Sequence, residues 1–255
     1  MRAPVLFISH GAPTIALDTV KGKRFKDWAD TIERPRGILA ISAHWLTEQP
    51  TIGTTTRLPL IYDFYGFPRN LYEVKYPANP AKFLAERLQD VSTLTKYSHQ
   101  ETRGWDHGVW TPLVHMYPKA DVTILQISIP TFSSKELFEL GRQMQSLRDE
   151  GILIVASGQA THNLQEFRPD KGNEPSPWAK AFDDWLAETL VAQNVENLIE
   201  HETLSPDFWK NHPTNEHFLP LLIAAGAGID GTSKTSFPIT GFDHGSLSDR
   251  CVQFG

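Results

Sequence analysis

The sequence predicts an α/β protein in which a mostly parallel central sheet carries helices on both faces. Four short apolar runs rich in β-branched residues, at residues 5–9, 37–42, 122–128 and 152–157, are typical of buried strands. Segments with apolar residues at helical spacing lie between and after these runs. Strands that alternate with helices pack as three layers, so the order of the elements indicates this fold class.

Four helices are expected, at residues 81–91, 135–148, 178–191 and 218–225. Ser133 or Ser134 is a suitable N-cap for the second helix, and Thr214 for the last. The Pro- and Asn-rich segment 168–177 is expected to be a surface loop, and residues 250–254 a last edge strand. Because no linker or internal repeat interrupts this pattern, the 255 residues are expected to form a single domain.

The composition excludes several classes of protein. The chain has 30 acidic residues against 24 Lys and Arg, with a formal net charge of −6, which gives no electrostatic basis for binding nucleic acid. No stretch approaches 18 consecutive apolar residues, so no membrane partner is expected and the location is predicted to be cytoplasmic. The single cysteine, Cys251, excludes an internal disulfide and a thiolate-rich metal cluster. A bound metal would therefore require histidine and carboxylate ligands.

Three of the ten histidines follow predicted strands. His10, His44 and His162 come after the first, second and fourth apolar runs. The carboxyl ends of parallel strands meet at one edge of an open sheet, where ligands bind. A hydrogen-bonded loop histidine is the simpler interpretation of any one of them, but three at corresponding positions favour a shared site.

Two further segments supply candidates. His107 lies in the glycine-bracketed loop Gly104-Trp105-Asp106-His107-Gly108, which is either a substrate-contacting loop or a tight turn with packed aromatic residues. Glu216 and His217 begin the apolar helix at 218–225, and neighbours on a helix point ~100° apart, so at most one of the two is expected to face a given site.

The remaining histidines are expected to be mostly scaffold. His115 is interpreted as a core histidine, His99 and His201 as surface residues, and His212 as support for a helix start. His244 is expected either to be structural or to line the pocket.

Two or three histidines with at most one carboxylate suit Zn²⁺ or Fe²⁺ in an open site, and a further unbound histidine suits proton transfer. Motifs for dinucleotide binding, phosphate binding, His-Glu-x-x-His zinc binding and a Gly-x-Ser-x-Gly nucleophile are missing from the sequence.

Taken in order, seven segments resemble the class III extradiol ring-cleavage dioxygenases, in the branch similar to DOPA 4,5-dioxygenase. The segments run through nearly the whole chain: Ser9-His10-Gly11-Ala12-Pro13, Ser42-Ala43-His44-Trp45, Tyr62-Asp63-Phe64-Tyr65-Gly66-Phe67-Pro68, Gly104-Trp105-Asp106-His107-Gly108, Ala156-Ser157-Gly158 with Thr161-His162-Asn163-Leu164, Pro213-Thr214-Asn215-Glu216-His217-Phe218-Leu219-Pro220-Leu221, and Gly245-Ser246-Leu247-Ser248.

The resemblance implies a single divalent metal held by His10, His44 and one residue of the Glu216-His217 pair, with His217 favoured. Fe²⁺ would be the working metal, and Zn²⁺ is often bound in such proteins. His162 carries over as the acid/base residue and His107 as a histidine that contacts the substrate. The implied reactants are a catechol, either DOPA-like or a related small catechol, and O₂, and assembly into a homo-oligomer is compatible with the sequence.

Three more residues are expected to contact the substrate: Tyr65, Trp105 and His244. The aromatic segment 62–68, which contains Tyr65, is either a lid over a planar ring or a packed loop. Two rival functions remain open from the residues alone. The same histidines would suit a zinc-dependent hydrolase or amidase, or a structural zinc site, although structural sites are usually closed and contain cysteine.

Overall fold

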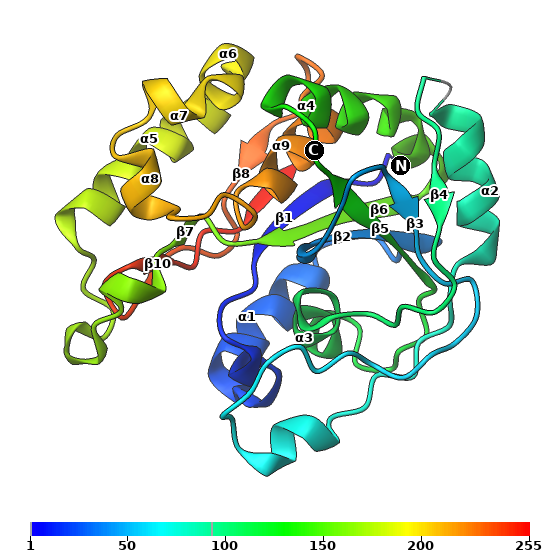
Figure 1. Ribbon diagram of the computed structural model, residues 1–255, viewed down its shortest axis with the longest axis horizontal. Helices are drawn as coiled ribbons and strands as arrows, with labels where there is room; N and C mark the ends of the chain where they lie inside the picture. Colours follow the sequence, from blue (N-terminus) through cyan, green and yellow to red (C-terminus); the bar gives the residue numbers. More distant parts are fainter. Residues whose placement is uncertain (1, 93) are drawn as a thin grey trace.

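A mixed, mostly parallel sheet forms the centre of the molecule in the computed structural model, which describes residues 2–92 and 94–255 (Figure 1). Its eight strands run in the order β4-β3-β5-β2-β6-β1-β11-β8. Their bounds are β1 Val5–Ser9, β2 Gly37–Thr47, β3 Thr51–Ile52, β4 Ser98–His99, β5 Ile124–Pro130, β6 Ile152–Gly158, β8 Thr235–Ser236 and β11 Val252–Phe254. The central strands β5, β2, β6 and β1 are parallel, and β11 and β8 add an antiparallel margin.

Helices cover both faces of this sheet, so the predicted three-layer α/β class is confirmed (Figure 1). On one face lie α1 (Thr19–Ala29) and α3 (His107–Met116); on the other lie α2 (Lys82–Val91), α4 (Ser134–Gln143) and α9 (Leu219–Gly228). Successive residues of a strand point to opposite faces, and in β1 alternate side chains enter the two cores. Both faces are therefore apolar, which explains the continuous hydrophobic runs.

Helix α9 packs closely against α4 because glycine stands at their contact. Every residue of α9 is buried, which is typical of a helix enclosed on all sides. A Cβ atom at Gly226 would overlap the backbone carbonyl of Phe138 in α4. This close contact fixes α9, whose amino end carries His217, against the sheet.

A smaller unit lies beyond the carboxyl ends of β1 and β6, at the left in Figure 1. It contains a three-stranded antiparallel sheet of β7 (Thr161–His162), β10 (Leu247–Ser248) and β9 (Phe242–Asp243), with helices α5 (Pro177–Val191), α6 (Val195–Ile199), α7 (His201–Leu204) and α8 (Phe208–Asn211). Arg250 Nε donates to Asp183 of α5 over 2.8 Å, which ties this helix to the segment after β10. Short 3₁₀ helices complete the chain: η1 (Pro13–Leu17), η2 (Arg69–Glu73), η3 (Gln145–Glu150), η4 (Leu164–Glu166) and η5 (Pro169–Lys171).

Several boundaries differ from the sequence predictions. The helix expected at 135–148 ends at Gln143 and continues as η3, and β2 runs on to Thr47 through a register shift between Ile41 and Leu46. The strand expected at the sheet edge begins at Val252 and pairs with both β1 and β8, so β8 takes the edge. A two-residue strand such as β8 is too short to show a periodic pattern.

Among the described residues, none of the helices combines the length and the apolar character needed to cross a membrane. The cytoplasmic location and the single-domain organisation stay predictions.

Candidate metal centre and active site

Five histidines from five different segments meet at the carboxyl edge of the parallel strands. The ring centroids of His10, His44 and His217 lie 5.0 to 5.4 Å apart. The ring of His107 is 3.9 Å from that of His44, and the ring of His162 stacks on His217 at 3.6 Å with an interplanar angle of 15°. The topology thus places together the histidines that the sequence assigned to one rim.

His10 follows β1 and is held in a defined tautomer. Its backbone N–H donates to the Gly158 carbonyl, and its Nδ1 lies 2.9 Å from the Ser157 hydroxyl. Ser157 donates its own hydrogen to the Gly108 carbonyl, so its oxygen must accept from His10 Nδ1–H. The His10 Nε2 atom is therefore left with a free lone pair, and burial with four neighbouring histidines holds the pKa of His10 well below its ordinary value.

His44 lies in the irregular end of β2, where its Nε2 faces His10 Nε2 at 3.1 Å. Its Nδ1 is 3.5 Å from the Asp63 carboxylate, which favours the proton on Nδ1 and leaves Nε2 unprotonated. Burial and the rings of His107 and His217 lower the pKa of His44 to about 2. Two unprotonated nitrogens this close repel each other unless a cation lies between them, so the donor set fits a divalent metal.

His107 begins α3 and is fixed by the same carboxylate. Its Nδ1 lies 2.9 Å from Asp63 Oδ1, and its backbone N–H donates to that oxygen over 3.1 Å. Burial raises the pKa of Asp63, but the hydrogen bond from His107 and the charge of that ring outweigh it and lower the pKa to about 2. Asp63 is therefore ionised, and it orients two imidazoles at once.

Glu216 lies behind His217 and accepts a hydrogen bond from its ring. His217 Nδ1 is 2.8 Å from Glu216 Oε1, and Thr214 donates to the same oxygen. Burial raises the pKa of Glu216, whereas the hydrogen bond from His217 lowers it to about 2. The carboxylate thus directs the second nitrogen of His217 outward, in the pattern of an outer partner of a metal-ligating histidine.

The nitrogens in this cluster allow more than one ligand set. His10, His44 and His107 offer ligand atoms within 4.8 Å of one another, and so do His162, Glu216 and His217. His10 and His44 belong to one set and His217 to the other. These distances are compatible with either His107 or His217 as the third ligand.

A cavity of about 470 Å³ opens above the histidines, within the ordinary range for small-ligand sites. Besides the five imidazoles and Gln159 its walls are apolar: Gly11, Ala12, Pro13, Phe64, Phe67, Leu164, Phe167 and Leu247. Phe64 packs edge-on against His107 with centroids 5.6 Å apart. The cavity can therefore hold a planar apolar ring next to the imidazoles.

Three residues expected to contact the substrate do not line this cavity. Tyr65 is 92% exposed, because the turn at Gly66 (φ +78°) directs it outward while Phe64 and Phe67 face inward. The side chain of Trp105 is buried, and its backbone carbonyl accepts a hydrogen bond from Ile61 N–H. The ring of His244 contacts that of Phe167, with centroids 4.3 Å apart and an interplanar angle of 44°.

Other histidine predictions have mixed outcomes. His201 was expected at the surface but is buried, because the single turn of α7 directs it against Phe208 and Phe218. His99 is exposed. His115 is half-buried, with Nε2 2.7 Å from the Ile15 carbonyl. His212 is buried, with Nε2 3.0 Å from the Ala160 carbonyl.

Sequence reasoning missed Asp63 and Gln159 as parts of the site. Gln159 accepts from Gly11 N–H and donates to the Ser248 carbonyl, so it joins three segments beneath the cavity. Its position directly after β6 could have identified Gln159 as a residue of the site. Asp63 lay inside the quoted aromatic segment 62–68, but only the folded loop shows that it reaches His107.

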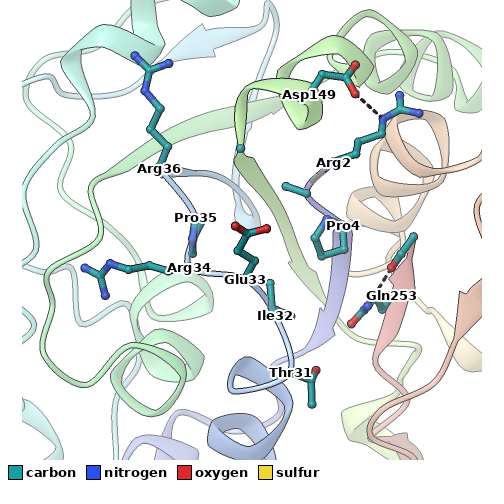
Figure 2. Close-up of a pocket in the computed structure, with 13 residues that line it drawn as sticks. Arg2, Pro4, Thr31, Ile32, Glu33, Arg34, Pro35, Arg36, Asp149 and Gln253 are labelled. Carbon is teal, nitrogen blue, oxygen red and sulfur yellow. Dashed lines mark hydrogen bonds and ion pairs between the residues drawn. The ribbon is translucent and has the colours of Figure 1, made fainter.

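A second cavity, of about 580 Å³, lies at the opposite, amino edge of the sheet (Figure 2). No histidine or cysteine occurs among its lining residues. Figure 2 shows Arg2 turned toward Asp149, and Arg34 pairs with Asp121 at 3.0 Å. Among the described residues, its lining therefore lacks the imidazoles that the first cavity presents.

A cluster of imidazoles beneath an apolar cavity, at the carboxyl edge of a parallel sheet, is typical of a metal-dependent enzyme. Residues 4–245 match the family model described as the catalytic LigB subunit of aromatic ring-opening dioxygenase. The chain belongs to this family, and its enzyme class is extradiol aromatic ring opening, as the resemblance implied.

Relatives of similar length support this placement. The chain is 40% identical to a 4,5-DOPA dioxygenase extradiol of Beta vulgaris, over 97% of this chain and 95% of that one. It is 39% identical to a protein of the same name from Escherichia coli (strain K12), over 100% and 95% of the two chains. The crystal structure of uncharacterized protein JW3007 from Escherichia coli K12 superposes with a TM-score of 0.84 at 33% identity and covers both chains completely.

Proposed function

We propose that the chain opens the ring of a small catechol beside its two hydroxyl groups, and that both atoms of O₂ enter the product. The metal would be held by His10, His44 and His217, with Fe²⁺ as the working ion. The observation that carries this proposal is the common pattern of the imidazoles: Ser157, Asp63 and Glu216 each face an Nδ1 atom, so the free Nε2 atoms remain for one cation.

When bound, the metal would supply Lewis acidity and a path for electrons from the ring to oxygen. The chain supplies orientation, because Phe64 and Phe67 line the same cavity as His10 and His44 and offer flat apolar surfaces to a planar ring. The apolar walls leave water few polar partners within that cavity.

His162 is proposed to move the protons. Its ring lines the cavity and lies parallel to His217, so it is within reach of a substrate bound beside that residue. A neutral imidazole is suited to accept a catechol proton and to return it later to the reacting oxygen. His107, which Asp63 holds in place, is proposed to contact the substrate.

Oxygen uptake by metal-reconstituted protein tests this function. The protein is stripped with a chelator under nitrogen, loaded with Fe²⁺ or Zn²⁺, and assayed against several catechols in an oxygen electrode with a visible spectrum. We expect one O₂ per catechol and a coloured ring-opened product with Fe²⁺ only. A zinc-loaded protein that hydrolyses amides and consumes no O₂ would instead support the hydrolase.

The ligand set is tested separately by metal content. We expect His10→Ala, His44→Ala and His217→Ala to lose most of the bound metal, whereas His107→Ala retains it. If His217→Ala keeps the metal and His107→Ala loses it, the third ligand is His107.

A further inference from the structure

Helix α3, which begins at His107, contains a proline where a helix normally has a backbone donor. Pro112 lies inside α3 and has no N–H group. In a regular α-helix that N–H would donate to the carbonyl of the residue four positions earlier, which is Gly108. Gly108 is buried, so its carbonyl needs a donor from another part of the chain.

Ser157, near the end of β6, supplies that donor. Its hydroxyl donates to the Gly108 carbonyl over 2.5 Å, in a position where the serine is itself buried. The first turn of α3 can approach the sheet this closely because Gly108 has no side chain. A Cβ atom there would overlap the Ser42 hydroxyl and would lie 3.1 Å from His44 Cδ2. The missing bond of the helix is thus replaced by a bond to the strand that ends beside the histidines.

The direction of this hydrogen bond determines what Ser157 can offer to His10. A serine hydroxyl has one hydrogen to donate, and the Gly108 carbonyl accepts it. The 2.9 Å contact between Ser157 Oγ and His10 Nδ1 must then be a donation from the ring, which places the imidazole proton on Nδ1. Nε2 of His10 carries a lone pair for a metal only in this tautomer.

We propose that Pro112 is a positioning residue, which keeps Nε2 of His10 free for the metal. Because Pro112 donates nothing to Gly108, the Ser157 hydroxyl remains hydrogen-bonded to that carbonyl. An alanine at position 112 would donate its own N–H to Gly108. The Ser157 hydroxyl would then be free to turn and donate to His10 Nδ1, which favours the opposite tautomer with the proton on Nε2. This inference rests on the proposed function in one respect, since it takes His10 as a metal ligand.

The proposal predicts that stability and metal affinity do not fall together. Proline in a helix interior is less favourable than alanine, so the Tm of metal-free Pro112→Ala is expected to equal or exceed that of the wild type. The same variant is expected to bind Zn²⁺ about tenfold more weakly, which is the lower end of what loss of an outer partner of a ligating histidine costs. A proline that only shapes α3 would not produce weaker metal binding in a protein that is at least as stable.

Zn²⁺ affinity is measured by competition with a chromophoric chelator. Tm is measured by circular dichroism with excess EDTA, so that bound metal does not contribute to stability. Pro177→Ala is the matched control, because Pro177 begins α5, where the N–H of a helix has no partner within the helix. We expect the control to keep wild-type affinity. A loss below threefold in Pro112→Ala, an equal loss in Pro177→Ala, or a lower Tm in Pro112→Ala overturns the proposal.

A double-mutant comparison tests whether Pro112 acts through Ser157. Ser157→Ala removes the acceptor for His10 Nδ1–H and is expected to weaken Zn²⁺ binding by about 10–100-fold. In that background Pro112→Ala should add less than about twofold, because the hydroxyl through which it acts is gone. Ser128→Ala is the control for a lost buried hydroxyl, since Ser128 in β5 bonds to threonines of β2 and β3, and it should keep wild-type affinity. Additive losses in the double variant overturn the proposed route.

The tautomer itself is measured by ¹⁵N–¹H NMR of metal-free protein labelled at histidine, with the His10 signals identified by their loss in His10→Ala. We expect the Nδ1–H form in the wild type and a gain of the Nε2–H form in Pro112→Ala; an unchanged tautomer contradicts the proposal. If the variants behave as expected but the Fe²⁺-loaded wild type opens no catechol, the proposed function fails and this inference stands. If catechols are opened and Pro112→Ala matches the wild type, this inference alone fails.

Discussion

The contact between strand β6 and the loop that carries His217 makes Gly158 a sensitive test of how the fold positions the metal centre. Gly158 ends β6, and its carbonyl accepts from His10 N–H. A Cβ atom at this position would overlap the His217 carbonyl oxygen, and would lie 3.1 Å from the carbonyl carbon of His217 and 3.2 Å from Pro220 Cγ. Gly158→Ala must therefore separate His217 from His10.

The size of this displacement can be worked out from the contact. Ordinary van der Waals contact begins near 3.4 Å, so the added methyl group forces the two backbones apart by roughly 1 Å. A displacement of ~1 Å at reacting groups costs up to about a hundredfold in rate. Overpacking of this kind also costs about 1–3 kcal/mol of unfolding free energy, or roughly 2–12 °C in Tm for a chain of this size.

The assay measures kcat by oxygen uptake, bound metal by elemental analysis and Tm by circular dichroism. Gly37→Ala is the control, because Gly37 begins the neighbouring strand β2 at the opposite edge of the sheet. Its Cβ atom would meet only movable side chains, with the ring of Phe83 nearest at 3.1 Å. We expect Gly37→Ala to keep wild-type turnover. The reasoning is refuted if Gly158→Ala folds, binds metal and turns over as fast as the control.

Four other predictions follow from the site and its surroundings. His162→Ala is expected to keep bound metal but lose about 10²–10⁴-fold in kcat, and an equal loss of metal would make His162 a ligand. Asp63→Asn is expected to reduce kcat or metal affinity by about 10–100-fold with little change in Tm; wild-type values for both would show that Asp63 does not orient His44 and His107. Tyr65→Ala is expected to change kcat/KM by no more than about twofold for every catechol, and a larger effect would restore a lid role. Burial lowers the pKa of His201 to about 4. At His201 the unfolded chain therefore takes up a proton below about pH 6.5 that the folded chain refuses, so this residue alone lowers stability by ~1.4 kcal/mol per pH unit down to about pH 4. Denaturation of His201→Phe should show a flatter profile in this range; an unchanged slope would locate the acid sensitivity elsewhere.

The fold class could be predicted from the sequence because the central strands are buried on both faces. Such strands appear as unbroken apolar runs, and those at 5–9 and 152–157 match β1 and β6 almost residue for residue. The short strands at the edges of the sheet could not be predicted from the sequence. Strand β8 spans two residues, and the continuation of β2 to Thr47 depends on its pairing with β5. Pairing partners distant in sequence leave no local pattern.

The residues of the site show the same difference between what the sequence predicts and what only the folded chain shows. His10 and His162 could be placed because strand ends of a parallel sheet converge wherever the sheet is formed. The inward turn of Phe64 and Phe67 could not be separated from the outward turn of Tyr65, since that depends on the path of a loop around Gly66. His201, between Glu200 and Glu202, has polar sequence neighbours, but a one-turn helix directs a single side chain inward and the others into solvent.

The charges around the histidines support the metal proposal. Asp63 and Glu216 are ionised and contact the imidazoles, and burial keeps His10 and His44 neutral. Two carboxylates balance one divalent cation, so the site is close to neutral when a metal is present.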